Sequence, residues 1–266
     1  MTARRLASGG DGHATLMDTG YSSCYGTVYR THWWWQSRED NVIRLVRAFL
    51  PRRDGRAKIL DIGCGDGFIW PRLAAFGSVE GIEPDPVLVA ADSPNRSRIE
   101  PAGLLEGRDR PADHDLVLML DVLEHIEDER AALDRVTTLL APGGMLVLTV
   151  PALGLLWSEF DVLSGHHRRY HRAALRAALH RAGLRTLFLR YTYAWAVLPL
   201  FARRLLFSAD AGEHSHFVKP PARPLNTVLR RLSLVDHAVT RRLPVPFGSS
   251  LTAVALKPVN HTDRPE

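Results

Sequence analysis

The sequence predicts an α/β fold with a mostly parallel sheet, and three observations support this. Residues 58–67, KILDIGCGDG, read as a short buried strand that runs into a glycine turn. Residues 115–120, DLVLML, are apolar on both faces, as in a central parallel strand. Residues 129–140 have helical spacing, and the turn PGG at 142–144 leads from them into another apolar strand at 145–150. Strands that alternate with helices are typical of a parallel sheet with helices on both faces.

The glycine turn is the strongest local signal in the chain. Gly63, Gly65 and Gly67 stand at alternate positions, and a helical pattern begins at Phe68. Glycine is used where the backbone needs a positive φ or must pass close to a ligand. A strand, a glycine turn and a helix form the first half of a nucleotide-binding α/β unit.

The spacing of this turn argues against a dinucleotide. The fingerprint G-x-G-x-x-G needs a glycine where this chain has Phe68. Asp61, near the end of the strand, would repel a pyrophosphate and attract a ligand that carries an ammonium group. The stretch resembles motif I of the class I S-adenosylmethionine-dependent methyltransferases. This resemblance implies that S-adenosylmethionine is the cofactor, and that Asp61 and the three glycines bind it.

The second strand is expected at 79–83 and ends in Glu83, 22 residues after Asp61. An acidic residue at this point binds ribose hydroxyls in nucleotide-binding folds, because a carboxylate can accept two hydroxyl hydrogens at once. Residues 84–96 then predict a helix, and residues 98–105 a weak third strand. Members of the family often contact adenine after that strand, but no residue of this chain matches that pattern.

Asp121, Glu124 and His125 follow the strand at 115–120, so they emerge at the carboxyl edge of the sheet, where open α/β sheets bind ligands. The stretch resembles the motif that follows strand four in small-molecule methyltransferases, which implies that Asp121 lies near the methionine part of the cofactor. With the PGG turn and the strand after it, the landmarks follow the family's order. The resemblance implies a Rossmann-like seven-stranded sheet, mostly parallel, with an antiparallel last strand.

The rest of the chain divides as follows. Residues 171–182 predict a helix, 184–191 the sixth strand and 250–256 the last strand. Almost 60 residues separate these two strands, whereas the family often has a short link. The predicted units are a flexible tail at 1–30, a methyltransferase core at 31–192 and 248–258, and a helical insertion at 193–247 that includes a helix at about 224–242. The insertion either caps the substrate cleft, lies on a membrane surface or packs as a helical hairpin.

An aromatic run precedes the first predicted helix. Ser37 and Asp40 have the spacing of a helix start. The preceding His32 to Arg38 stretch resembles the pattern HWW-x-x-x-R of a related methyltransferase subset. Trp34 is therefore expected to contribute to a lid over the substrate, the alternative being that the tryptophans only pack the helix on the domain.

Three histidines are candidates for a catalytic base. Histidine titrates near neutral pH, so it can remove a proton from an oxygen or nitrogen acceptor. His125 is the first candidate because it sits just past the sheet edge, and His166 and His167 in the loop after strand five are the second. The structural alternatives are a hydrogen bond at a helix start for His125 and plain solvation for the pair.

Arg168, Arg169 and Tyr170, in the same loop, are expected to bind the acceptor, because arginine grips carboxylate or phosphate groups with a fork of donors. Asp121, Glu124 and His125 also offer metal ligands, and some ubiquinone-pathway O-methyltransferases, which this region resembles, have been linked to a divalent ion. A cofactor role for Asp121 is preferred, and no metal site is predicted. His214 and His216 lack the further ligands of a metal site.

The charge distribution favours an anionic partner. The net charge is +5, but residues 162–257 contain 16 Lys/Arg against three acids. A phosphorylated substrate, an acidic lipid surface or solvated helix faces would each explain this bias. Nucleic acid is not favoured, because no N-P-P-Y-like motif is present. The first ten residues lack the apolar core of a signal peptide, and we expect a cytoplasmic protein with peripheral membrane contact as an option.

These observations predict an enzyme that transfers a methyl group from S-adenosylmethionine to a small-molecule or lipid-linked acceptor, with O-methylation as the first choice. An NAD(P)-dependent oxidoreductase is one alternative, but it needs the missing glycine at position 68 and a Tyr/Lys pair. The other alternative is a non-catalytic binding module built on the same fold. The intact glycine turn and Glu83 count against that.

Overall fold

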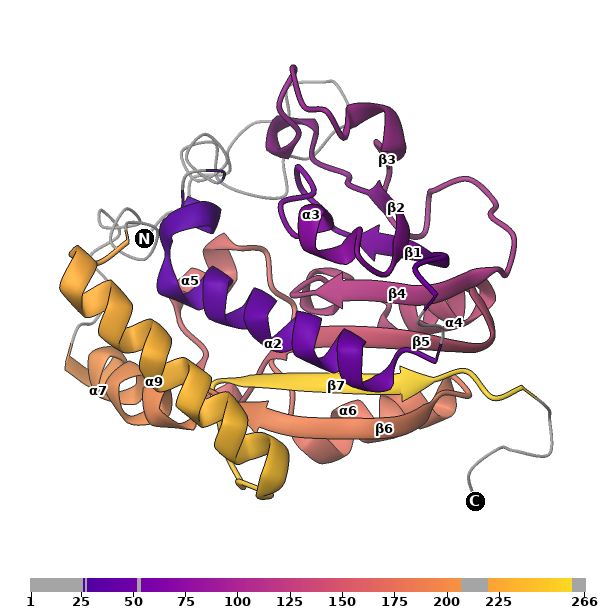
Figure 1. The fold of residues 1–266 in the computed structure, drawn as a ribbon. Coiled ribbons are helices and arrows are strands. Elements are labelled where there is room, and N and C mark those ends of the chain that lie inside the picture. Colours follow the sequence, from indigo (N-terminus) through magenta and orange to yellow (C-terminus); the bar gives the residue numbers. More distant parts are fainter. Residues whose placement is uncertain (1–25, 27, 52–53, 207–219, 260–266) are drawn as a thin grey trace, which may run out of the picture.

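A single seven-stranded sheet organises the part of the chain that the computed structural model describes, residues 26, 28–51, 54–206 and 220–259 (Figure 1). The strand order is β3-β2-β1-β4-β5-β7-β6. Strands β1 to β5 pair in parallel, and β7 runs antiparallel to both of its neighbours. The predicted sheet, mostly parallel with an antiparallel last strand, is confirmed.

The strands lie close to where the sequence predicts them. Their bounds are β1 Ala57–Ile62, β2 Gly77–Ile82, β3 Ile99–Glu100, β4 His114–Leu120, β5 Leu140–Pro151, β6 Arg185–Thr192 and β7 Ser250–Leu256. Alternate side chains of the central strands point to opposite faces, which gives each face of the sheet its own apolar core. In β4, Val117 and Met119 belong to one core, and Leu116 and Leu118 to the other.

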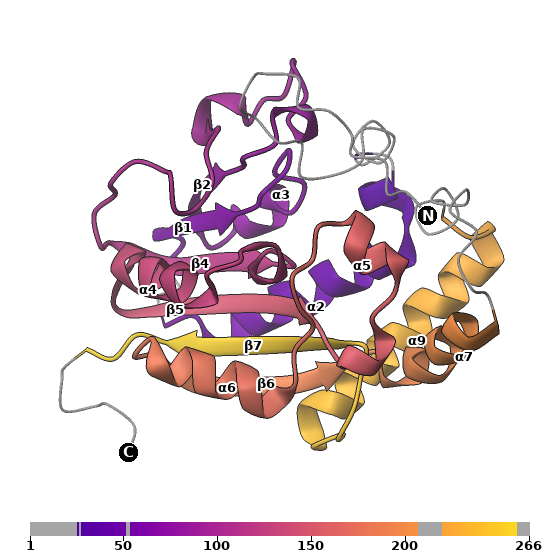
Figure 2. The same cartoon turned by 180° about the vertical axis from the view of Figure 1, so that it is seen from behind.

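Helices cover both faces of the sheet. Their bounds are α2 Trp33–Phe49, α3 Trp70–Leu73, α4 Glu129–Leu139, α5 Glu159–Leu163, α6 Arg172–Arg181, α7 Val197–Leu206 and α9 Arg223–Arg242. Figure 1 shows α2 and α9 crossing one face of the sheet, and Figure 2, the view from behind, shows α4 and α6 on the opposite face. Because the carboxyl ends of β1, β4 and β5 lie at one edge, the loops that follow them meet there.

The helix predicted to start near Ser37 begins earlier. It starts at Trp33, and His32 is its N-cap, since the His32 Nδ1 atom accepts a hydrogen bond from the Trp34 amide at 3.1 Å. Ser37 is fully buried inside the helix, and its hydroxyl donates to the Trp34 carbonyl at 3.0 Å. The expected start at Ser37 is therefore wrong, because the aromatic residues before it form the first turn of α2.

The helix predicted at 84–96 is also wrong. The segment contains a 3-10 turn at Pro86–Leu88, and a second 3-10 turn follows at Arg96–Arg98. The Asp85 carboxylate accepts the Val87 amide at 3.0 Å, which holds a tight turn, and Pro94 lacks the amide hydrogen that a helix would need. The helix expected from Phe68 is a single turn, α3, and β3 is shorter than predicted.

The predicted insertion at 193–247 contains the whole of α7 and α9, in agreement with its helical character. Its His214 and His216, and residues 1–25 of the predicted tail, lie outside the described residues. None of the helices in the described part is long and apolar enough to cross a membrane. The division into tail, core and insertion, and the role of the insertion as a cap, remain predictions.

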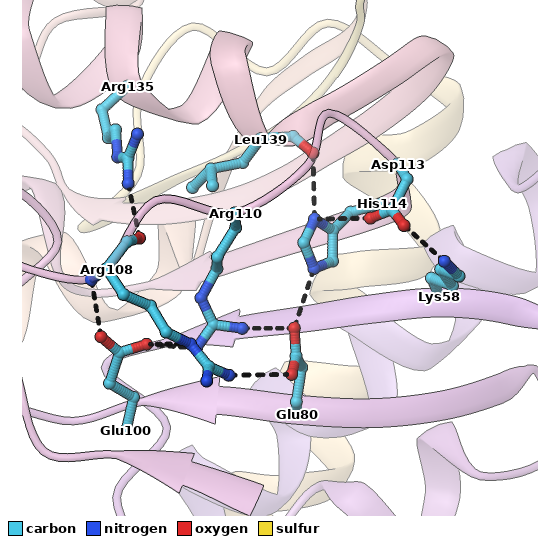
Figure 3. Close-up of polar contacts among 9 residues, drawn as sticks. All are labelled: Lys58, Glu80, Glu100, Arg108, Arg110, Asp113, His114, Arg135 and Leu139. Atoms are coloured by element: carbon cyan, nitrogen blue, oxygen red, sulfur yellow. Dashed lines mark hydrogen bonds and ion pairs between the residues drawn. The ribbon is translucent and has the colours of Figure 1, made fainter.

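A network of charged side chains ties β2, β3 and β4 together away from the glycine turn (Figure 3). The almost fully buried Arg110 guanidinium pairs with the carboxylates of Glu80 and Glu100. His114 bridges the Glu80 carboxylate, at 3.1 Å, and the Leu139 carbonyl, at 3.0 Å. Arg110 therefore links the carboxylates of two neighbouring strands.

Candidate cofactor and catalytic site

The glycine turn adopts the backbone that its sequence predicts. Gly63, Gly65 and Gly67 have φ angles of 67°, 53° and 72°, in the left-handed region that disfavours other residues. A Cβ atom on Gly63 would lie 2.4 Å from a methyl group of Val122, so no side chain fits there. The Gly63 amide donates to the Ile82 carbonyl at 2.8 Å, which fixes the turn against the end of β2.

Glu83 connects the end of β2 to this turn. Its carboxylate accepts the Gly65 amide at 2.8 Å through Oε2 and the Asp85 amide at 2.9 Å through Oε1. Each oxygen keeps a further lone pair for a ligand hydroxyl. Burial raises the pKa of Glu83 to about 7, although the two amide hydrogen bonds work in the opposite direction.

Asp61 is buried at the end of β1, close to both features. Its Oδ2 atom accepts a hydrogen bond from the Trp70 indole nitrogen at 2.9 Å. Burial raises the pKa of Asp61 to about 7, against the opposing effect of this hydrogen bond. Sequence reasoning did not identify Trp70, which approaches Asp61 because α3 folds back beside the turn.

Asp121 emerges at the end of β4 in a left-handed conformation, with φ of 57°. Its amide donates to the Thr149 carbonyl at 2.9 Å, and its carboxylate forms an ion pair with Arg38 of α2. The Arg38 guanidinium also lies 4.9 Å from the centre of the Trp34 ring. Trp34, Arg38 and Asp121 line one small enclosed pocket, together with Tyr193.

Sequence reasoning did not assign Arg38 a role. Its signal was present, since Arg38 is the arginine of the HWW-x-x-x-R stretch. The resemblance could not show which acidic residue this arginine meets. The structure places it on Asp121, which joins the aromatic helix start to the carboxyl edge of the sheet.

Glu124, His125 and His166 gather beside Asp121. One ligand atom from each lies within 4.8 Å of the others, and the two imidazole rings are 4.7 Å apart at their centres. Glu124 is fully buried, and neither carboxylate oxygen has a hydrogen-bond partner among the described residues. Burial, followed by the nearby Asp121 charge, raises the pKa of Glu124 well above its usual range. This donor set suits a cation better than Asp121, Glu124 and His125 together, because the carboxylate of Asp121 is held by Arg38.

The two histidines of this cluster differ in their surroundings. Burial and the neighbouring His166 lower the pKa of His125 to about 4, so His125 is neutral at physiological pH. His166 donates from Nδ1 to the Asp161 carboxylate at 2.8 Å. A carboxylate on one imidazole nitrogen orients the ring and supports a proton on the other, as in catalytic His-Asp pairs. The His167 side chain, in contrast, is exposed.

Asp161 is a fully buried residue that sequence reasoning missed. It forms the capping box of α5 with Ser158, whose amide donates to Oδ2 at 2.8 Å. Burial alone would raise its pKa, but hydrogen bonds from His166 and Arg169 lower the pKa to about 2. The Ser-x-x-Asp spacing is visible in the sequence, but it does not reveal that the same carboxylate would hold His166.

The three residues predicted to bind an anionic acceptor have different surroundings. Arg169 donates to both oxygens of Asp161, at 2.8 and 3.0 Å, so its guanidinium positions Asp161. Tyr170 is buried in the core, and its backbone pairs with Pro151 and Leu153. Arg168 is half-buried and donates to the Glu127 carbonyl at 2.5 Å. Contact of Arg168 with an acceptor remains a prediction.

The comparisons with known proteins agree with this geometry. A family model described as a methyltransferase domain matches residues 33–188. The chain belongs to this methyltransferase family. S-adenosylmethionine is therefore its cofactor, and the glycine turn with Glu83 fits that ligand. The third glycine of a dinucleotide fingerprint is Phe68 here, so the oxidoreductase alternative has no support.

Individual relatives are more distant. The mitochondrial ubiquinone biosynthesis O-methyltransferase of Schizosaccharomyces pombe is 33% identical over 120 residues, which are 41% of this chain and 43% of that protein. The match thus spans less than half of the relative's length. A similar protein of Bradyrhizobium is 32% identical over 109 residues, 39% of this chain and 42% of its own.

The sheet and its helices also resemble solved structures. A putative sarcosine dimethylglycine methyltransferase from Galdieria sulphuraria superposes with a TM-score of 0.60 and 16% identity, covering 90% of this chain and 99% of that one. At this identity the likeness concerns the fold alone. The methyltransferase fold predicted from the sequence is confirmed by this comparison.

Proposed function

We propose that this protein transfers the methyl group of S-adenosylmethionine to a hydroxyl oxygen of a small-molecule or lipid-linked acceptor. The observation that carries the proposal is the Asp161–His166 pair beside His125, at the same edge of the sheet as the glycine turn. A hydroxyl acceptor must lose its proton as the new O–C bond forms, and this cluster supplies a place for that proton.

The cofactor would be held by residues of the turn and its neighbours. The amides of the glycine turn and the remaining lone pairs of Glu83 suit the nucleoside, and Asp61 and Asp121 provide negative charge for the amino-acid part. When bound, S-adenosylmethionine supplies a methyl group already activated by the positive sulfonium. The protein then mainly positions the acceptor and excludes water.

His166 and His125 have different roles at the acceptor. His166 takes the proton, because Asp161 holds one ring nitrogen and stabilises the positive charge that forms. His125 remains neutral and can hydrogen-bond to the acceptor, because its pKa lies at about 4. The exposed His167, a candidate from the sequence, has no orienting carboxylate among the described residues.

The choice of oxygen is supported by the names of the curated relatives, which are O-methyltransferases of ubiquinone biosynthesis. An acceptor of that chemistry is a hydroxylated ring with an attached hydrocarbon chain. Arg168 is proposed to contact a negative charge on the acceptor, and Trp34 to cover it from α2. Arg169 and Tyr170 are proposed to act indirectly, through Asp161 and the core.

The proposal is tested by methyl transfer from labelled S-adenosylmethionine to a panel of phenols, catechols and amines. We expect label on a hydroxylated aromatic acceptor, and a decrease in turnover of about 10²-fold or more in His166→Gln. The matched control is His171→Gln, which changes an exposed histidine at the start of α6. Label on amines alone would overturn O-methylation. Transfer to no acceptor, with cofactor binding intact, would favour a binding module.

A further inference from the structure

Helix α9 has its polarity reversed relative to an ordinary surface helix. The residues it buries against the rest of the protein are polar, namely Ser233, His237 and Thr240. The residues it exposes along one line are aliphatic, namely Leu225, Val228, Leu232, Val235 and Val239, and we call these five the α9 stripe. A surface helix normally points its apolar side chains at the core.

The α9 stripe is continuous and open. Its members recur at intervals of three and four residues, so they lie on one side of the helix. Val228 and Val235 are 59% and 60% exposed. Exposure of this extent means that none of the described residues covers the stripe. A contiguous exposed apolar surface marks a place where another molecule binds.

Helix α7 also exposes apolar side chains. Both views draw α7 and α9 at the same end of the sheet (Figures 1 and 2). Leu198 of α7 is 77% exposed, and Phe201 is also exposed. The Arg204 side chain donates to the Leu155 carbonyl, which ties α7 to the loop after β5. The apolar surface therefore lies at the carboxyl edge of the sheet, where the candidate site is.

The charges around this surface are almost all positive. Helix α7 contains two arginines and α9 five, against one acidic residue, Asp236. The Asp236 carboxylate is turned inward, since it accepts the amides of Tyr193 at 2.7 Å and Ala194 at 2.9 Å. At about 100° per residue, Arg231 and Arg242 border the α9 stripe.

An apolar stripe with arginines along its border suits the surface of an anionic lipid bilayer. Such helices lie in the interface, with aliphatic side chains among the acyl chains and arginines at the phosphate groups. Each arginine near an anionic membrane surface adds to the attraction. The observed arrangement therefore has a chemical counterpart in acidic phospholipid.

The same spacing would also allow a coiled coil with a second copy of the chain, but the charges argue against that partner. Two α9 stripes in contact would bring the arginine borders together without acidic residues to offset them. The next seam position after Val239 is Arg242, which interrupts the apolar seam. Like charges at such a contact weaken it, whereas acidic lipid would strengthen binding.

We propose that α7 and α9 dock this protein on anionic lipid membranes, with the α9 stripe at the level of the acyl chains. Docking in this way would bring the candidate site to the membrane surface, where a hydroxylated acceptor with a hydrocarbon chain is accessible. The inference stands on the surface of α7 and α9 alone and does not require the proposed methyl transfer.

The test is co-sedimentation of the full chain with vesicles of phosphatidylcholine alone or with one third phosphatidylglycerol, at low and high salt. We expect binding to the anionic vesicles that weakens as salt rises. Leu232→Glu/Val235→Glu should reduce binding about tenfold or more, and Arg231→Gln/Arg242→Gln should reduce the preference for anionic lipid. The control is Val259→Glu, an exposed aliphatic residue beyond β7, which should bind as wild type does.

Folding of each variant is checked by circular dichroism and by its affinity for S-adenosylmethionine. The proposal is overturned if the folded wild type does not bind anionic vesicles at low salt, or if the stripe variant binds them equally well. If the protein does not bind vesicles, analytical ultracentrifugation shows whether the α9 stripe is covered by a second copy of the chain or by another segment of the same chain. A wild-type dimer that the stripe variant disrupts, without vesicle binding, would assign the stripe to a second copy. A monomer whose melting temperature falls in the stripe variant, again without vesicle binding, would assign it to another segment of this chain.

Discussion

Arg38 and Asp121 form an ion pair that joins helix α2 to the loop after β4. They are 83 residues apart in the sequence, and both side chains are largely buried. Arg38 also stacks on Trp34, so one guanidinium holds both the aromatic start of α2 and the edge of the proposed cofactor site. Through Arg38, the proposed lid residue Trp34 is therefore connected to the carboxylate of Asp121 in the proposed cofactor site.

Replacing Arg38 should weaken both stability and cofactor binding. In Arg38→Met, Asp121 would keep a charge that is mostly removed from water without its partner, so we expect a loss of about 3 kcal/mol in the free energy of unfolding. The measurement is chemical denaturation together with calorimetric titration of S-adenosylmethionine. Arg47→Met, on an exposed position of the same helix, is the control and should change stability by less than about 0.5 kcal/mol. Equal stability of the two variants would contradict a structural role for the pair.

Cofactor binding should depend on pH through Glu83 and Asp61. The folded protein without ligand holds protons on these groups up to about pH 7, well above their ordinary titration range. A ribose hydroxyl donates best to an ionised carboxylate, so we expect the affinity for S-adenosylmethionine to fall about tenfold between pH 7.5 and pH 6. In Glu83→Gln the affinity should be lower at all pH values and its pH dependence smaller. Asp92→Asn, which changes an exposed carboxylate, should follow the wild type.

The same two groups should affect stability in the opposite direction. Because their pKa values are raised on folding, the folded state binds more protons than the unfolded state between about pH 4 and pH 7. Their contribution to stability is therefore lost as pH rises through this window. Thermal melts should show that S-adenosylmethionine raises the melting temperature more at pH 8 than at pH 6. A ligand-induced shift that is larger at pH 6 would show that the ionised carboxylates are not what the cofactor needs.

Asp161 should be needed for catalysis more than for cofactor binding. In Asp161→Asn, His166 loses the carboxylate that orients it, and Arg169 loses its ion pair. We expect kcat to fall about 10²-fold or more, with the dissociation constant of S-adenosylmethionine changed by less than threefold. A purely structural role of Asp161 would instead weaken cofactor binding and lower the melting temperature along with kcat. An unchanged kcat in a folded variant would exclude the Asp161–His166 pair from catalysis.

The ion network around Arg110 should matter for folding alone. In Arg110→Met, Glu80 and Glu100 lose the buried cation between them, and we expect a loss of about 3–5 kcal/mol (Figure 3). Arg108→Met is the matched control, since Arg108 is largely exposed and should contribute less than about 1 kcal/mol. The pKa values of Glu80 and Glu100 are held below their usual range by Arg110 and their other partners despite burial. The free energy of unfolding that this network contributes should therefore decrease as pH falls. The decrease should be smaller in Arg110→Met than in the wild type.

The site was predictable from the sequence where its chemistry depends on local backbone. Gly63, Gly65 and Gly67 follow a buried strand and must take positive φ, so their pattern identifies the turn. Glu83 is tied to them because the next parallel strand must end at the same edge. The helix predicted at 84–96 was wrong because the local backbone preferences there were overlooked. Short polar side chains and Pro94 favour turns there, and helical spacing alone does not report them.

By itself, the sequence determined the alternation of strands and helices, the glycine turn, and which residues reach the carboxyl edge of the sheet. These features follow from hydrophobic periodicity and backbone geometry, which act over a few residues. Only the tertiary structure decided that Arg38 meets Asp121, that Asp161 holds both His166 and Arg169, and that α9 buries its polar side. These outcomes depend on which elements pack together across long stretches of sequence. Burial then decides which charges must find partners, and no local pattern contains that information.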